Sequence, residues 1–252
     1  MEHDFKGKTV LVTGAGWGVG AAVALLFASY GAKVIVADTS EKGGKNLAGK
    51  IRGQNGEATF IRIDVSSPSE CDKLIKRTIE TYGSIDIACN NSAIFTERAH
   101  SLYKDINAVG NEMSLDVNSL FYCMKYEVEA MQKQGAGVII NMAFEVGANG
   151  LTSFDPSIAV KYGIDESTQN IPAEFSVGVI RVIAITQDII NKALLQGIRL
   201  TKRGMLLKLS AMARVAKMEK VASLVVWLSS DKTTFLLPSD KSSVVSWACA
   251  QN

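Results

Sequence analysis

The stretch TGAGWGVG, Thr13 to Gly20, decides how the chain is interpreted because it separates two different sequence patterns. Before it lies TVLVTG, a short valine-rich apolar run that is typical of a buried strand. After it, GAAVALLFASYG has apolar residues at helical spacing and ends at Gly31. The next apolar run, AKVIVAD, ends at Asp38. The pattern predicts a strand, a helix and a second, parallel strand, with the glycines in the first turn.

Glycines at such a turn suit a dinucleotide, because they allow a tight turn and let the helix N-terminal N–H groups approach a pyrophosphate. Asp38 follows about twenty residues later, where a carboxylate can accept hydrogen bonds from ribose hydroxyls and repel a 2′-phosphate. Ala15, Trp17 and Thr39 offer no basic side chain for that phosphate. The sequence therefore predicts dinucleotide binding, with NAD favoured over NADP. The alternative is that the glycines only pack helix against strand and that Asp38 only caps the next helix.

The rest of the chain continues to alternate between strands and helices. Strand-like runs recur at residues 58–65, 85–91, 137–143 and 177–186, and a long helix is expected from roughly Asn111 to Gln134. Such alternation implies a parallel sheet that helices cover on both faces. We expect one α/β domain over residues 1–252. It should be a Rossmann-type, doubly wound parallel sheet of about seven strands in a three-layer α/β/α arrangement.

The composition argues against several classes of partner. The 27 basic and 25 acidic residues are interspersed and leave a net charge of +2, so no positive stripe is present for a nucleic acid. The cysteines are far apart and predict reduced thiols rather than a metal site; they are Cys71, Cys89, Cys123 and Cys249. No long uncharged apolar run and no signal-peptide layout are present, which predicts no membrane segment and a cytoplasmic location.

These residues resemble the short-chain dehydrogenase/reductase family over nearly the whole chain. Its cofactor motifs match the glycine loop at Gly14, Gly18, Val19 and Gly20, the acidic residue Asp38, the adenine-contacting pair Asp64 and Val65, and the NNAG motif at Asn90 and Asn91. Ser92 and Ala93 replace the last two letters of NNAG. The resemblance implies that the matched residues bind NAD(H) and that the chain forms a homodimer or homotetramer. It also implies conversion between an alcohol and a carbonyl on a small ligand.

The catalytic residues of the family are only partly matched. DVNSLFY resembles the helix with the active-site asparagine, which assigns that role to Asn118, and Lys161 matches the lysine that binds the ribose. Ser157 stands at the position of the acid/base tyrosine, and Phe144 at that of the serine that polarises the carbonyl. Serine is a far weaker acid than tyrosine, and losing the acid forfeits roughly 10²- to 10⁴-fold in rate. We therefore expect an NAD(H)-binding protein with impaired or absent catalysis.

Two other functions stay open on the sequence alone. An active oxidoreductase would need another proton donor, such as a water held between Ser157 and Lys161, or His100. A scaffold or interaction module with an empty cleft would need no donor, and Lys161 would then be a surface lysine. The basic helical segment near residues 187–214 falls where the family has its substrate lid. This segment can select anionic ligands, or it can be a pair of amphipathic helices whose basic residues face the solvent.

Overall fold

The computed structural model describes residues 4–92, 106–144, 163–164, 166–168, 179–187, 217–234 and 245–246. Within these ranges the side chains of residues 106–116, 144, 179, 186–187 and 245–246 are not described.

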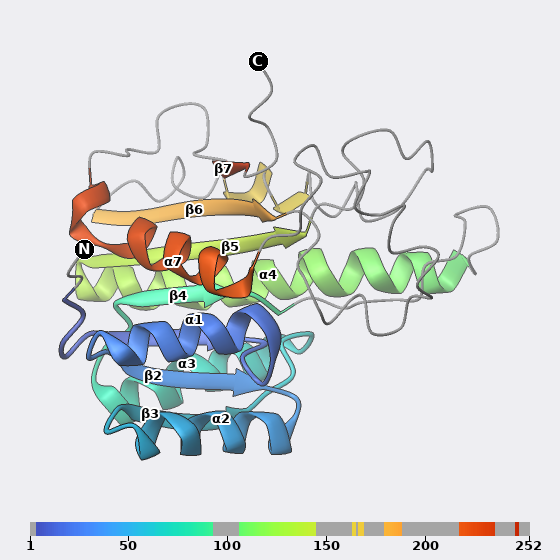
Figure 1. Ribbon diagram of the computed structural model, residues 1–252. Helices are drawn as coiled ribbons and strands as arrows, with labels where there is room; N and C mark the ends of the chain where they lie inside the picture. The colour runs from blue at the N-terminus through green and yellow to red at the C-terminus, as the bar shows by residue number, and fades with distance from the viewer. Residues whose placement is uncertain are drawn as a thin grey trace.

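A seven-stranded parallel sheet forms the centre of the molecule (Figure 1). Its strands are β1 (Thr9–Thr13), β2 (Lys33–Asp38), β3 (Glu57–Arg62), β4 (Ile87–Asn90), β5 (Ala136–Phe144), β6 (Val179–Gln187) and β7 (Val245–Ser246). They lie in the order β3-β2-β1-β4-β5-β6-β7, and every neighbouring pair is parallel. The order reverses direction between β1 and β4, and in such sheets ligands bind at the carboxyl ends of the strands beside that reversal.

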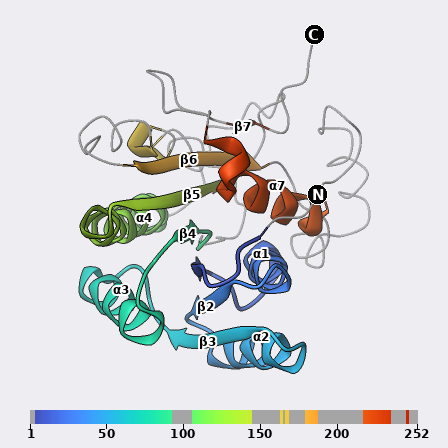
Figure 2. The same ribbon diagram turned by 90° about the vertical axis from the view of Figure 1, so that its left-hand side faces the viewer.

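Helices cover both faces of the sheet, as Figure 2 shows in end view. On one side lie α1 (Gly18–Ser29), α2 (Glu41–Gly53) and α7 (Met218–Ser229); on the other lie α3 (Pro68–Tyr82) and α4 (Ile106–Gln134). A short 3-10 helix, η2 (Asp231–Thr233), follows α7. The predicted doubly wound, three-layer α/β/α fold is therefore confirmed.

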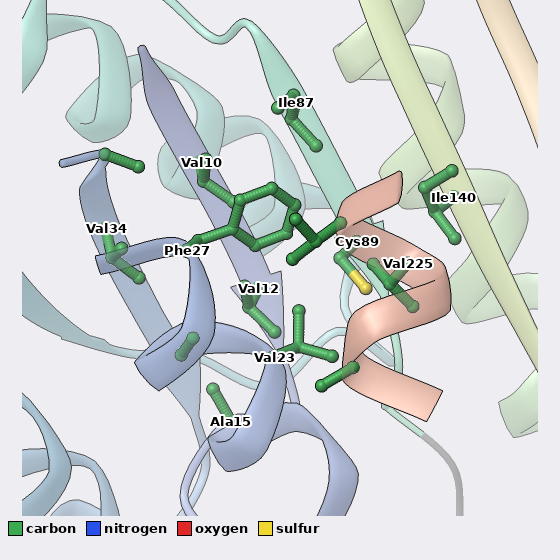
Figure 3. Packing of buried hydrophobic residues seen from close by; sticks show 14 of the residues in the cluster. Val10, Val12, Ala15, Val23, Phe27, Val34, Ile87, Cys89, Ile140 and Val225 are labelled. Carbon is green, nitrogen blue, oxygen red and sulfur yellow. The ribbon is translucent and has the colours of Figure 1, made fainter. Parts of the chain in front are cut away.

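The core consists of two apolar layers, one on each face of the sheet. All five residues of β1 are buried, which is why its sequence is an almost continuous apolar run rather than an alternating one. Phe27 of α1 packs on one face among Val10, Ile87 and Val225, which come from β1, β4 and α7 (Figure 3). The helices α3 and α4 cover the other face with Leu74, Met124 and other apolar side chains.

Arg181 of β6 ties the sheet to the end of α7. Its side chain is buried, and its guanidinium donates hydrogen bonds to carbonyl oxygens of Leu228 (3.0 Å) and Ser230 (3.2 Å) and to Oγ1 of Thr233 (2.9 Å). The last carbonyl groups of a helix have no partner within the helix. The guanidinium donates hydrogen bonds to carbonyl groups at the end of α7. Burial of this side chain lowers the pKa of Arg181.

Candidate dinucleotide-binding site

The glycine loop joins β1 to α1 at the carboxyl edge of the sheet. Gly14 and Gly18 have φ angles of +60° and +64°, which residues other than glycine rarely adopt. Gly20 is required for a different reason, since a Cβ there would lie 2.5 Å from the Gly14 carbonyl oxygen and 2.6 Å from Nδ2 of Asn91. The first turn of α1 contains no acidic residue, and its N-cap residue Trp17 makes no side-chain capping bond. The N–H groups of this turn can therefore face an anion.

Asp38 lies at the end of β2 with its carboxylate against the glycine loop. Its side chain is buried, with Oδ2 accepting a hydrogen bond from the Gly16 N–H at 2.7 Å and Oδ1 accepting one from the Ser40 N–H at 2.7 Å. The cap of α2 is Ser40, whose Oγ accepts from the Gly43 N–H at 3.2 Å. The helix-capping role that the sequence left open for Asp38 thus belongs to Ser40. A carboxylate oxygen can accept further bonds beyond these two N–H groups, so Asp38 can still bind hydroxyl groups.

The end of β4 is bonded to the same loop. Nδ2 of Asn91 donates to the carbonyl oxygens of Thr13 (3.3 Å) and Gly14 (3.2 Å). In return, Oγ1 of Thr13 accepts from the N–H groups of Asn91 (3.1 Å) and Ser92 (3.2 Å). Both strands that flank the reversal of the sheet order therefore set the shape of the loop.

Asn90, which the family resemblance also assigns to the cofactor, directs its amide into the molecule instead. Its buried Nδ2 donates to Oε2 of Glu127 at 2.9 Å and to Oδ1 of Asn141 at 3.1 Å. These bonds join β4 to α4 and β5, which is the sheet-supporting role of the motif. The cofactor-lining role of Asn90 stays a prediction.

Asp64 and Val65 follow β3 at the same edge. Asp64 is exposed, and its Oδ1 accepts from the N–H (3.0 Å) and the Oγ (2.7 Å) of Ser66, while its own N–H donates to Oε2 of Glu70 at 2.9 Å. Val65 is half-buried against the core layer of α3 and α4. The structure thus brings the glycine loop, Asp38 and these two residues to one edge of the sheet, and the adenine contact remains a prediction.

The predicted catalytic residues are described less completely. Asn118 is exposed on α4, although the adjoining Ser119 and Leu120 are buried. Phe144 is the last residue of β5 and pairs with Gln187 of β6, but its side chain is not described. Ser157 and Lys161 lie outside the described residues. Also outside the described residues lie His100, Cys249 and residues 188–214 of the lid-like segment. The catalytic roles therefore stay predictions.

One buried carboxyl was missed by the sequence reasoning. Glu127 of α4 has no exposed surface, and burial raises its pKa to about 7, although the Asn90 hydrogen bond lowers it in part. The signal was present, since Glu127 interrupts the apolar spacing formed by Met124, Val128 and Met131. In the part of the chain that the structure describes, no cluster of three potential metal ligands occurs. None of the described helices is long and apolar enough to cross a membrane.

Comparison with known proteins agrees with this geometry. The sequence model of a family described as enoyl-(acyl carrier protein) reductase matches residues 14–238. A short chain dehydrogenase/reductase, astE, of Aspergillus oryzae is 32% identical over 242 residues, covering 94% of this chain and 93% of that protein. The chain belongs to the short-chain dehydrogenase/reductase family. A protein of Thermotoga maritima called an uncharacterized oxidoreductase is 33% identical to this chain over 246 residues, which cover 92% of this chain and 94% of that protein.

A solved structure supports the fold of this short-chain dehydrogenase/reductase. It is that of NAD+-bound xylitol dehydrogenase, which superposes with a TM-score of 0.85 at 22% sequence identity and covers 93% of this chain and 96% of its own. At this level of identity the likeness concerns the fold.

Proposed function

We propose that this short-chain dehydrogenase/reductase binds NAD(H) at the carboxyl ends of β1, β2 and β4, and that its catalysis is impaired or absent. The observation that carries the binding proposal is the Asp38 carboxylate, which the Gly16 and Ser40 N–H groups hold beside the glycine loop at 2.7 Å each. The family membership and the NAD+-bound xylitol dehydrogenase neighbour support a nicotinamide cofactor.

The fit of this chain to the cofactor rests on its loop and its charges. Gly14, Gly18 and Gly20 keep the turn free of side chains where a pyrophosphate would approach, and Asn91 braces the loop from β4. Asp38 would accept hydrogen bonds from the adenosine ribose, while its negative charge disfavours the 2′-phosphate of NADP. NAD is therefore the dinucleotide that this site favours.

The impairment of catalysis follows from two side chains. When bound, NAD supplies the group that accepts or donates a hydride. The proton that must move with that hydride needs an acid near the working pH, and Ser157 is far too weak an acid for that role. Phe144 offers no hydrogen bond to a carbonyl oxygen, which removes a further stabilising contact of the transition state.

Calorimetric titration with NADH and NADPH tests the binding proposal. NADH should bind more tightly than NADPH, and Asp38→Ala should weaken NADH binding about tenfold or more because it removes hydrogen bonds to a charged acceptor. Asp72→Asn is the matched control, since this carboxylate lies on α3 and pairs with Lys76 rather than with the loop. An undetectable affinity for NADH in the unaltered protein would instead favour the scaffold alternative.

Single-turnover hydride transfer tests the impairment. The unaltered protein, loaded with NADH, should not reduce a broad panel of ketones at a useful rate, whereas the Ser157→Tyr, Phe144→Ser double variant should regain activity. Rapid turnover by the unaltered protein that Lys161→Ala abolishes would contradict the proposal and favour an active enzyme with another proton donor. The predicted homo-oligomer is open to sedimentation analysis, and the cytoplasmic location stays a prediction.

A further inference from the structure

Glu127 is a buried carboxyl that the proposed hydride chemistry does not use. It lies on the side of α4 that faces the sheet, and its side chain is completely buried. Among the described residues, Nδ2 of Asn90 donates a hydrogen bond to its Oε2 at 2.9 Å. A buried carboxylate ordinarily has a cation or several donors around it, because removing a charge from water is unfavourable.

The pair formed by Glu127 and Asn90 contains two buried oxygens that have no hydrogen-bond partner among the described residues. They are Oε1 of Glu127 and Oδ1 of Asn90, and both are acceptors when the acid is ionised. One proton on Oε1 would change this, because a carboxylic acid and a primary amide can form a ring of two hydrogen bonds. The amide N–H then donates to one carboxyl oxygen, and the acid O–H donates to the amide oxygen. The structure contains the first of these two bonds.

No positive charge acts on Glu127 from the part of the chain that the structure describes. The described titratable groups that interact with it are two thiols, Cys89 of β4 and Cys123 of α4, and the Sγ of Cys123 lies 3.8 Å from that of Cys71 on α3. Burial raises the pKa of Cys89 to about 12, and the pKa of Cys123 is raised by its contact with Cys71 and by burial, so both thiols stay neutral. Among the described residues the buried cation is Arg181, whose donors are occupied at the end of α7.

The pair is connected to the glycine loop through β4. Asn90 is followed directly by Asn91, whose amide donates to the Thr13 and Gly14 carbonyl oxygens. The same Asn90 Nδ2 also donates to Oδ1 of Asn141 on β5, at 3.1 Å. A shift of the Asn90 amide would therefore displace the end of β4, where Asn91 holds the glycine loop.

We propose that Glu127 is a neutral carboxylic acid paired with the Asn90 amide, and that it is a positioning residue for the glycine loop. Its ionisation leaves the two oxygens unpaired beside a buried charge and loosens the end of β4. The part that concerns NADH rests on the proposed dinucleotide binding, whereas the protonation of Glu127 does not.

Unfolding in denaturant, measured from about pH 5 to about pH 9, tests the protonation. The folded pKa of Glu127 is raised above its ordinary value of 4.5 to about 7, so the folded state binds the extra proton between these values. Its contribution to stability is thus lost as the pH rises from about 4.5 through about 7. Glu127→Gln, which keeps a donor toward the Asn90 oxygen at every pH, should lack this loss, so its stability relative to the wild type rises across that range.

Glu129→Gln is the matched control, because Glu129 is exposed two residues further along α4 and pairs with Lys133. Lys133 lowers the pKa of Glu129, so this substitution should leave the decline above pH 4.5 in place. Should Glu127→Gln fail to fold, infrared difference spectra of the unaltered and the Glu129→Gln proteins test the same point. The spectra of both proteins should contain the C=O band of a protonated, buried carboxyl group, and this band should disappear at alkaline pH. Parallel stability curves for the wild type and Glu127→Gln, or no such band, would overturn the proposal.

NADH titration at about pH 6 and about pH 9 tests the positioning role. Affinity of the wild type and of Glu129→Gln should fall severalfold at the higher pH, and that of Glu127→Gln should change less. Equal losses in all three proteins would overturn the positioning role. If none of them binds NADH at either pH, it is the proposed dinucleotide binding that fails, and the stability curves still decide whether Glu127 is neutral.

Discussion

Gly20, in the first turn of α1, leaves no room for a side chain beside the glycine loop. A Cβ at this position would lie 2.5 Å from the Gly14 carbonyl oxygen, which is backbone and cannot rotate away. Gly20→Ala should therefore shift the loop, destabilise the protein by about 1–3 kcal/mol and weaken NADH binding. Chemical denaturation and NADH titration measure the two effects.

Gly49→Ala provides the comparison for that substitution. Gly49 is exposed inside α2, and a Cβ there would meet nothing within 4 Å. Alanine is the better helix former, so this variant should gain about 0.5–1 kcal/mol and bind NADH unchanged. Equal stability changes in the two variants would show that crowding at Gly20 is not what selects glycine.

At the scale of elements, the end of α7 depends on a side chain from another part of the chain. Arg181→Met should remove the donors to the Leu228 and Ser230 carbonyl oxygens while keeping much of the apolar volume. These carbonyl oxygens then keep the hydrogen bonds that Thr233 donates but lose the charged donor, so we expect a loss of about 2 kcal/mol in the free energy of unfolding. Arg77→Met, at an exposed position of α3, should change stability by less than about 0.5 kcal/mol. A comparable loss in both variants would contradict the capping role of Arg181.

At the scale of the whole molecule, cofactor binding and folding should be linked. A ligand that binds only the folded state raises the free energy of unfolding by about 2.7 kcal/mol at a free concentration of about one hundred times Kd. Thermal unfolding with increasing NADH should show this rise in the unaltered protein. The same NADH concentrations should stabilise Asp38→Ala far less. A rise of equal size in both proteins would mean that NADH binds elsewhere.

The amino-acid sequence by itself determined the elements and one edge of the site. The apolar runs, the helical spacing and the turn at Thr13 to Gly20 predicted a parallel sheet with helices on both faces, and the structure has seven parallel strands. These features are local, because periodicity and glycine content report on backbone conformation within a few residues. The long helix was predicted from about Asn111 but begins at Ile106, since apolar spacing locates an element better than its end.

Only the tertiary structure decided which side chains meet. It holds Asp38 between the Gly16 and Ser40 N–H groups, brings Asn91 rather than Asn90 to the loop, and places Glu127 against Asn90. Asn118, predicted for the active site, is exposed in the same helix. Apart from Ser40, these partners come from segments far apart in the chain, so the pairing of β1, β2 and β4 and the packing of α4 on the sheet select them. The physical reason is that burial raises the pKa of a carboxyl, and burial depends on which elements pack against one another.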